Sequence, residues 1–251
     1  MGGGRLRLRA IDVVATALCA ALYAALGYLA WLGIVCPAVG VVRFWPVVVV
    51  PAVFATLFGP LVGGLGAAIG IFVSDMLIHG DALLSLTAGV PANFLGFYTL
   101  GKLSRSGLGP SEKAILRALG LAIPPLITAV LCAYGLLPLM VGLIFALACL
   151  ISYGCLYVAI KMAPDWEDYQ TGSVIGLLVG SIWIGIFVWL YSQFFVLPKV
   201  VGGGFRLPFY AAGIWMVWTF STEIPFLVIL GPPILEACSR AFPNLFRGRG
   251  R

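Results

Sequence analysis

The feature that most constrains this chain is the recurrence of apolar stretches about 20 residues long, the length that an α-helix needs to cross a bilayer. They recur from Ile11 to the C-terminal region, and short segments between them hold most of the charged residues. Charged residues make up 10% of the 251 residues, compared with about 25% in soluble globular domains. The sequence therefore predicts an all-α, polytopic transmembrane helical bundle, a single integral membrane domain over residues 1–251, and excludes a water-soluble fold.

Apolar runs between charges and turn residues indicate about eight spans. The expected spans are 11–33, 45–58, 61–79, 83–101, 114–134, 138–160, 173–197 and 208–231. The run at 45–58 is short and contains Pro46 and Pro51, so a helix there must be tilted, broken or partly re-entrant. Turn residues at 134–138 divide the run at 114–160, which is too long for one crossing.

The positions of lysine and arginine predict the orientation, because short cytoplasmic loops retain these residues. With the N-terminus inside, eight spans place 12 of the 15 basic residues on inner segments, and only Arg43, Lys199 and Arg206 fall outside. We therefore expect a multi-pass protein of the cell membrane with both termini cytoplasmic. Because the basic residues sit between apolar spans and form no basic face on a soluble module, we expect no nucleic-acid partner.

Few ionisable residues fall within the spans, where each costs roughly 2.5–3.5 kcal/mol on insertion scales. Asp75 and His79 lie four residues apart on one helix face near the outer end of the third span, and Asp81 follows in the turn. The pair could ligate a metal, bond loop backbone as a structural Asp–His pair, or face a ligand. His79 is the only histidine and no second ligand motif appears, so we expect no metal and no cofactor.

Three further polar positions are candidates. Asn93 follows Pro91, which can free a backbone carbonyl beside a cavity. Arg43 and Trp45, in the loop after the first span, suit either a clasp for an anionic or planar aromatic ligand or anchoring at the membrane interface. Glu223, which the predicted spans place in the inner half of the last one, is either part of a proton path or a structural acid. We expect the other tryptophans to be belt or core residues; these include Trp31, Trp183, Trp189, Trp215 and Trp218.

Small residues recur at four-residue spacing on several spans and allow close helix approach. Ala17, Ala21 and Ala25 mark the first span, and similar glycine stripes mark the spans at 61–79 and 173–197. Packing within the chain explains each stripe. For the first span, docking onto a separate membrane subunit is an alternative that the residues leave open.

A longer stretch resembles the substrate-binding S components of energy-coupling factor (ECF) transporters. The resemblance is strongest over residues 11–101, and its motifs are Leu57-Phe58-Gly59-Pro60-Leu61-Val62-Gly63-Gly64-Leu65-Gly66-Ala67-Ala68-Ile69-Gly70, Ser74-Asp75, Leu86-Thr87-Ala88-Gly89-Val90-Pro91-Ala92-Asn93 and Gly96, together with the alanine face of the first span. S components generally have six helices, so a six-helix core within the eight spans is possible.

The resemblance implies a ligand near the outer face, bounded by Arg43, Trp45, Asp75, His79, Asp81 and Asn93. It implies that the solute is a vitamin, a related cofactor precursor or a transition-metal ion, and the single histidine argues against the metal. It also implies that the chain works within the lipid bilayer. The implied partners are a transmembrane coupling subunit, which Ala17, Ala21 and Ala25 would contact, and two ATPase subunits. The chain has no P-loop, so ATP hydrolysis must come from these partners.

We therefore predict a substrate-binding importer subunit with no catalytic residues. Two other functions fit parts of the pattern. An ion-coupled secondary transporter would use Glu223 as a proton carrier and would need no ATPase partner. An intramembrane enzyme would use Asp75 and His79, with Glu223, for acid–base or metal-assisted chemistry, which requires those groups to converge.

Overall fold

The computed structural model describes residues 9–33 and 45–243, and all the regular secondary structure in this part of the chain is helical. Seven helical segments are long and apolar enough to cross a membrane, and the apolar segment Pro46–Phe58 is shorter. The elements are α1 (Ala10–Trp31), a 3₁₀ turn (Pro46–Val48) leading into α2 (Val49–Phe58), α3 (Pro60–Ile78), α4 (Ala82–Leu84), a π-helical turn (Ser85–Gly89), α5 (Val90–Leu103), α6 (Pro110–Ala133), α7 (Leu139–Met162), α8 (Glu167–Phe194) and α9 (Tyr210–Ala241).

The predicted fold class is confirmed, and the irregular run at 45–58 is a 3₁₀ turn followed by a short helix. Two predicted boundaries are wrong. The last helix continues past residue 231 through Pro232 and Pro233, which a helix packed among neighbours tolerates because other groups satisfy the freed carbonyls. Helix α8 begins at Glu167 rather than at residue 173, and its acidic first turn suits the positive end of the helix dipole.

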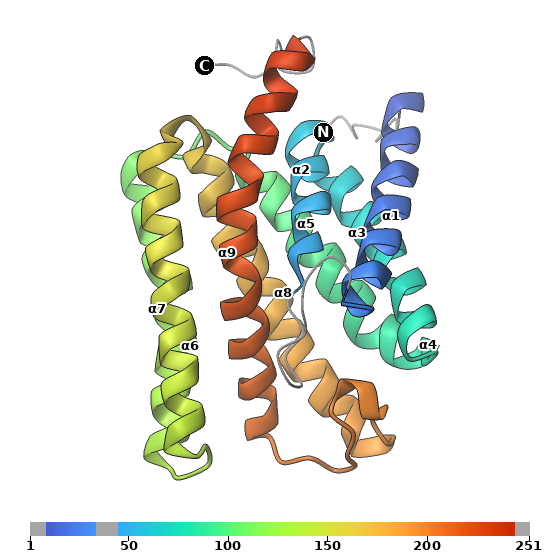
Figure 1. The fold of residues 1–251 in the computed structure, drawn as a ribbon, viewed down its shortest axis with the longest axis vertical. Coiled ribbons are helices and arrows are strands. Elements are labelled where there is room, and N and C mark those ends of the chain that lie inside the picture. The colour runs from blue at the N-terminus through green and yellow to red at the C-terminus, as the bar shows by residue number, and fades with distance from the viewer. Residues whose placement is uncertain (1–8, 34–44, 244–251) are drawn as a thin grey trace, which may run out of the picture.

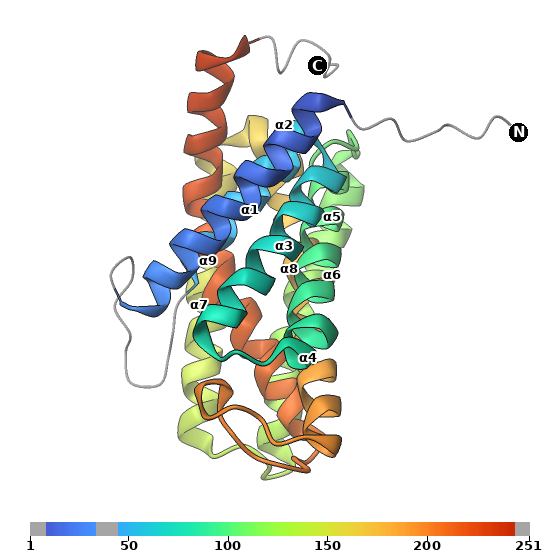
Figure 2. The same cartoon turned by 90° about the vertical axis from the view of Figure 1, so that its right-hand side faces the viewer.

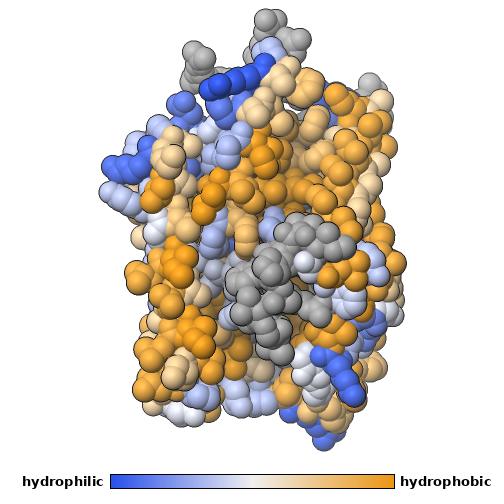
Figure 3. All heavy atoms as spheres, viewed as in Figure 1, coloured by the Kyte–Doolittle hydropathy of each residue, from blue (hydrophilic) through white to orange (hydrophobic). Residues whose placement is uncertain are grey.

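The helices run up and down so that α1 begins and α9 ends at the same end of the bundle (Figure 1). On the face seen in Figure 3, apolar side chains make up most of the coloured surface between the two ends, and the most hydrophilic ones gather toward the ends. Many large apolar side chains on α6 and α7 are more than half exposed, including Leu126 and Leu150. A bilayer accounts for this exposure, because lipid covers an apolar surface that water would penalise.

Helices α6 and α7 form a hairpin on the outside of α8 and α9 (Figure 1). Ion pairs at one end hold α6 against α8: Lys113 Nζ lies 2.7 Å from Asp168 Oδ1, and Arg117 Nη1 lies 2.7 Å from Glu167 Oε1. The acidic residues at the start of α8 therefore bind the hairpin to the rest of the bundle. The remaining helices are α1, α2, α3, the α4–α5 unit, α8 and α9.

Helix α1 packs on α3 through small residues of both helices (Figure 2). A Cβ added at Gly66 would lie 2.6 Å from the sulfur of Cys19, and one added at Gly70 would lie 2.9 Å from the carbonyl oxygen of Ala20. The glycine stripe of α3 therefore serves packing within the chain. The alanine stripe of α1 points the other way, and its members are exposed: Ala17, Ala21 and Ala25.

Candidate functional site

A cavity of about 340 Å³ lies among α1, α3, the α4–α5 unit, α8 and α9, with Trp45 of the segment before α2 in its wall. This volume falls in the range of about 300–1,000 Å³ usual for small-molecule sites. Residues from the last turns of α3 and from the first half of α9 line it, so it occupies the half of the bundle away from the start of α1. Neither α6 nor α7 contributes a lining residue. The site is therefore formed by helices other than α6 and α7, and the α6–α7 hairpin lies outside it.

The walls of the cavity are largely aromatic and aliphatic, and glycines lie where helices come closest. Gly96 of α5 faces Gly176 and Gly180 of α8. Four tryptophans line the cavity: Trp31, Trp45, Trp215 and Trp218. Three of them were expected only as belt or core residues. The sequence could not place them, because tryptophan at a helix end is common for interfacial reasons alone.

The structure brings Asp75 and His79 together at the cavity wall, as their spacing predicted. Asp75 Oδ1 lies 3.5 Å from His79 Nε2, and its other oxygen accepts a 2.6 Å hydrogen bond from the hydroxyl of Ser85. His79 Nδ1 accepts a hydrogen bond from the backbone N–H of Asp81. Gly89, in the π-helical turn, leaves room for this carboxylate, since a Cβ there would lie 2.7 Å from Asp75 Oδ2. The pair is thus held by protein partners on both sides.

Asp81 does not line the cavity. Its side chain accepts a hydrogen bond from the backbone N–H of Leu84 at the start of α4, and its second oxygen accepts one from the hydroxyl of Tyr191 at 2.6 Å. Burial alone would raise the pKa of Asp81, but these two hydrogen bonds outweigh it and hold the pKa below its usual value. Asp81 therefore joins the α3–α4 turn to α8.

We expect Asp81→Ala to destabilise the protein by about 1–2 kcal/mol, because it removes a helix cap and leaves Tyr191 without its acceptor. Asp81→Asn keeps one oxygen and should lose less. Because the folded-state pKa of Asp81 is depressed, its ionised carboxylate stabilises the folded protein at pH values above the ordinary pKa of 3.8. This stabilisation is lost as the pH falls through the lower folded-state pKa. Thermal unfolding in detergent at several pH values measures this, and equal stability of Asp81→Ala and wild type at pH 7 would contradict it.

Asn93 and Trp45 meet through Tyr23 of α1. The hydroxyl of Tyr23 donates to Asn93 Oδ1 at 2.8 Å and accepts from the indole N–H of Trp45 at 3.1 Å. Asn93 Nδ2 in turn donates to the carbonyl oxygen of Gly89. This chain of bonds ties three helical segments together at the cavity wall. Tyr23 is a site residue that sequence reasoning missed, because a tyrosine within an apolar span carries no distinguishing signal.

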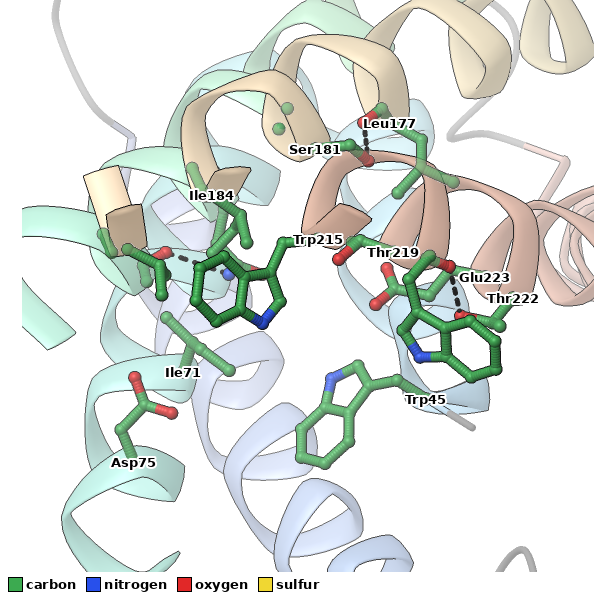
Figure 4. A pocket seen from close by; sticks show the side chains of 18 of the residues that line it. Trp45, Ile71, Asp75, Leu177, Ser181, Ile184, Trp215, Thr219, Thr222 and Glu223 are labelled. Atoms are coloured by element: carbon green, nitrogen blue, oxygen red, sulfur yellow. Dashed lines mark hydrogen bonds between the residues drawn. The ribbon is translucent and has the colours of Figure 1, made fainter. Parts of the chain in front are cut away.

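Glu223 lines the same cavity as Asp75, which corrects its predicted place in the inner half of the last span. The reason is the true extent of α9, which begins at Tyr210 and ends at Ala241, so that Glu223 lies nearer its first end. Thr219 precedes it by four residues and faces the same way. Figure 4 shows the two side chains directed toward the space between the indoles of Trp45 and Trp215, with Asp75 across from them.

Four of the six predicted substrate-binding residues line the cavity: Trp45, Asp75, His79 and Asn93. Asp81 does not, and Arg43 lies outside the described residues. Among the described lining residues no lysine or arginine occurs. The ionisable groups that line the cavity are therefore the carboxyl groups of Asp75 and Glu223 and the imidazole of His79.

A family model described as "ECF-type riboflavin transporter, S component" matches residues 7–141, more than half of the chain. The match begins just before α1 and ends at the start of α7. Most of α7, all of α8 and all of α9, which carries Glu223, therefore lie beyond it. No curated protein and no solved structure matches the chain.

Proposed function

Because the chain belongs to the family of ECF-type riboflavin transporter S components, the substrate-binding membrane subunits of these transporters, we propose that its cavity binds riboflavin or a closely related planar vitamin. The observation that carries this proposal is the cavity itself. Its volume of about 340 Å³ suits a small molecule, and its four tryptophans offer flat apolar surfaces. Aromatic rings of a ligand gain stacking energy against such walls in addition to the apolar area they bury.

The direction of transport follows from the predicted orientation. With both termini cytoplasmic, the half of the bundle that holds the cavity faces outward, so the chain captures its solute from outside. An S component is a transport protein and not an enzyme, and delivery of the solute to the cytoplasm requires energy from elsewhere.

The partners proposed for this step are a transmembrane coupling subunit and two ATPase subunits. The sequence has no P-loop of its own. Support for docking comes from the exposed alanine face of α1, which no other helix of the described part of the chain covers, although its small side chains allow close approach. A secondary transporter that uses Glu223 as a proton carrier would instead transport its solute without an ATPase.

The experiment is a binding titration. We expect riboflavin to quench the tryptophan fluorescence of the detergent-purified protein with a stoichiometry of one, because several indoles line the cavity. Protein from cells fed riboflavin should also retain it through purification, as mass spectrometry of the bound small molecules would show. If no flavin is retained and no quenching occurs, the proposed ligand is wrong. Uptake in cells that lack the ATPase subunits would contradict the proposed coupling.

A further inference from the structure

The polar groups that line the cavity differ in whether the protein already satisfies them. Asp75 is bonded by Ser85 and His79, and Asn93 is bonded by Tyr23 and Gly89. The hydroxyl of Ser181 donates to the carbonyl oxygen of Leu177. These groups shape the wall, and their hydrogen-bonding capacity is largely used within the chain.

Glu223 and Thr219 are different. Within residues 9–33 and 45–243, the carboxyl group of Glu223 accepts no hydrogen bond and forms no ion pair, and the hydroxyl of Thr219 has no hydrogen-bond partner. Both line the cavity and face its interior (Figure 4). A carboxyl group placed in an apolar, aromatic site without a partner is costly, and such intramembrane groups ordinarily mark a ligand path.

The indole N–H groups of Trp215 and Trp218 also make no hydrogen bond within the described part of the chain, and both residues line the cavity. Together with the hydroxyl of Thr219 they are donors, whereas the carboxyl group of Glu223 offers an acceptor oxygen. One turn of α9 thus presents an acceptor and a donor side by side, with further donors on the same helix. A ring edge that carries an N–H beside carbonyl oxygens complements this arrangement. Its N–H can donate to the carboxyl group, and its carbonyl oxygens can accept from the donors of α9.

We propose that Glu223 is a specificity-determining residue that accepts a hydrogen bond from a ring N–H of the bound heterocycle, with the donors of α9 serving the adjacent carbonyl oxygens. The inference rests on the proposed function and deepens it. Riboflavin has such an edge, in which the N3–H lies between two carbonyl groups. Lack of a lysine or arginine among the described lining residues agrees with a ligand whose recognised edge is neutral and donates a hydrogen bond.

The test compares riboflavin with 3-methylriboflavin, in which a methyl group replaces the N3 hydrogen. The wild-type protein should bind riboflavin about 10- to 100-fold more tightly than the methylated probe, the range expected when a buried hydrogen bond is lost and its acceptor is left unsatisfied. Glu223→Ala should weaken riboflavin binding by a similar factor and should reduce the discrimination between the two flavins to a few-fold. Glu223→Gln keeps a carbonyl oxygen and should show an intermediate loss for riboflavin.

The matched control is Glu236→Ala, which removes a carboxylate from the same helix outside the cavity, where it pairs with Arg240. It should bind riboflavin as the wild type does. Equal riboflavin affinity of wild type and Glu223→Ala, with both proteins folded by thermal unfolding, would overturn the inference and leave the proposed function intact. Absence of riboflavin binding by the wild type would overturn the proposed function and the inference with it.

Discussion

The substitution Ala21→Trp is expected to abolish assembly with the coupling subunit while leaving ligand binding unchanged. Ala21 is exposed at the centre of the alanine face of α1, and the cavity residues of that helix, Tyr23 and Trp31, do not lie on this face. A close helix–helix contact in a membrane depends on small side chains, because van der Waals packing replaces the hydrophobic effect there. An indole at this position would hold the partner helix away.

Co-purification measures this effect. When the tagged chain is expressed with the coupling subunit and both ATPases, we expect recovery of these partners to fall at least about tenfold for Ala21→Trp and riboflavin uptake to fall with it, as expected when close interhelical packing is lost. The matched control is Leu143→Trp, on the exposed side of the hairpin helix α7. If the complex survives Ala21→Trp in full, the alanine face of α1 has no docking role. If the complex is lost in both variants, the effect of Ala21→Trp is not specific to this face.

The second large effect concerns the contact between α5 and α8 beneath the cavity. We expect Gly176→Leu to destabilise the protein by about 3 kcal/mol or more and to abolish ligand binding. A Cβ at Gly176 would lie 2.5 Å from the carbonyl oxygen of Gly96 and 3.0 Å from the backbone nitrogen of Leu100. Backbone atoms cannot rotate away as a side chain can, so the two helices must separate and the cavity between them must change shape.

Gly154→Leu is the matched control, because a Cβ at this helical glycine of α7 meets no atom within 4 Å. Replacing a helical glycine there should be neutral or stabilising by up to about 1 kcal/mol. Thermal unfolding in detergent and riboflavin titration of both variants measure the difference, which we expect to exceed about 5 °C in Tm. A Gly176→Leu protein that unfolds at the wild-type temperature would show that α5 and α8 do not depend on this close approach.

The membrane fold could be predicted almost completely from the sequence, because span length and hydropathy are local properties. The predicted span boundaries were wrong where packing against other helices, and not the local sequence, decides where a helix begins or ends. The last span was predicted to end at residue 231, but α9 continues through Pro232 and Pro233 to Ala241. The family was also recognisable, since the turn at Gly59 and Pro60 and the glycines of α3 are contiguous in the chain. Gly59 has φ 118°, a conformation that favours glycine, and Pro60 begins the next helix.

The candidate site was predicted only in part. Asp75 and His79 share a helix face, so their spacing alone brought them together. The hydrogen bonds of Asp81 to Leu84 and Tyr191 show instead a structural role that its position in a turn did not reveal. Trp215 and Trp218 lie more than a hundred residues from Asp75 in the chain, and no periodicity connects them.

The sequence by itself determined that this chain crosses a membrane many times, that it is helical throughout its spans, and that its first hundred residues resemble an S component. Each of these follows from hydropathy, helix length and local motifs. Only the tertiary structure decided that α6 and α7 stand outside the cavity, that the alanine face of α1 is uncovered, and that Glu223 faces Asp75 across one cavity. The physical reason is that hydropathy makes a span apolar without specifying its neighbours, and the neighbours depend on which helices can approach closely.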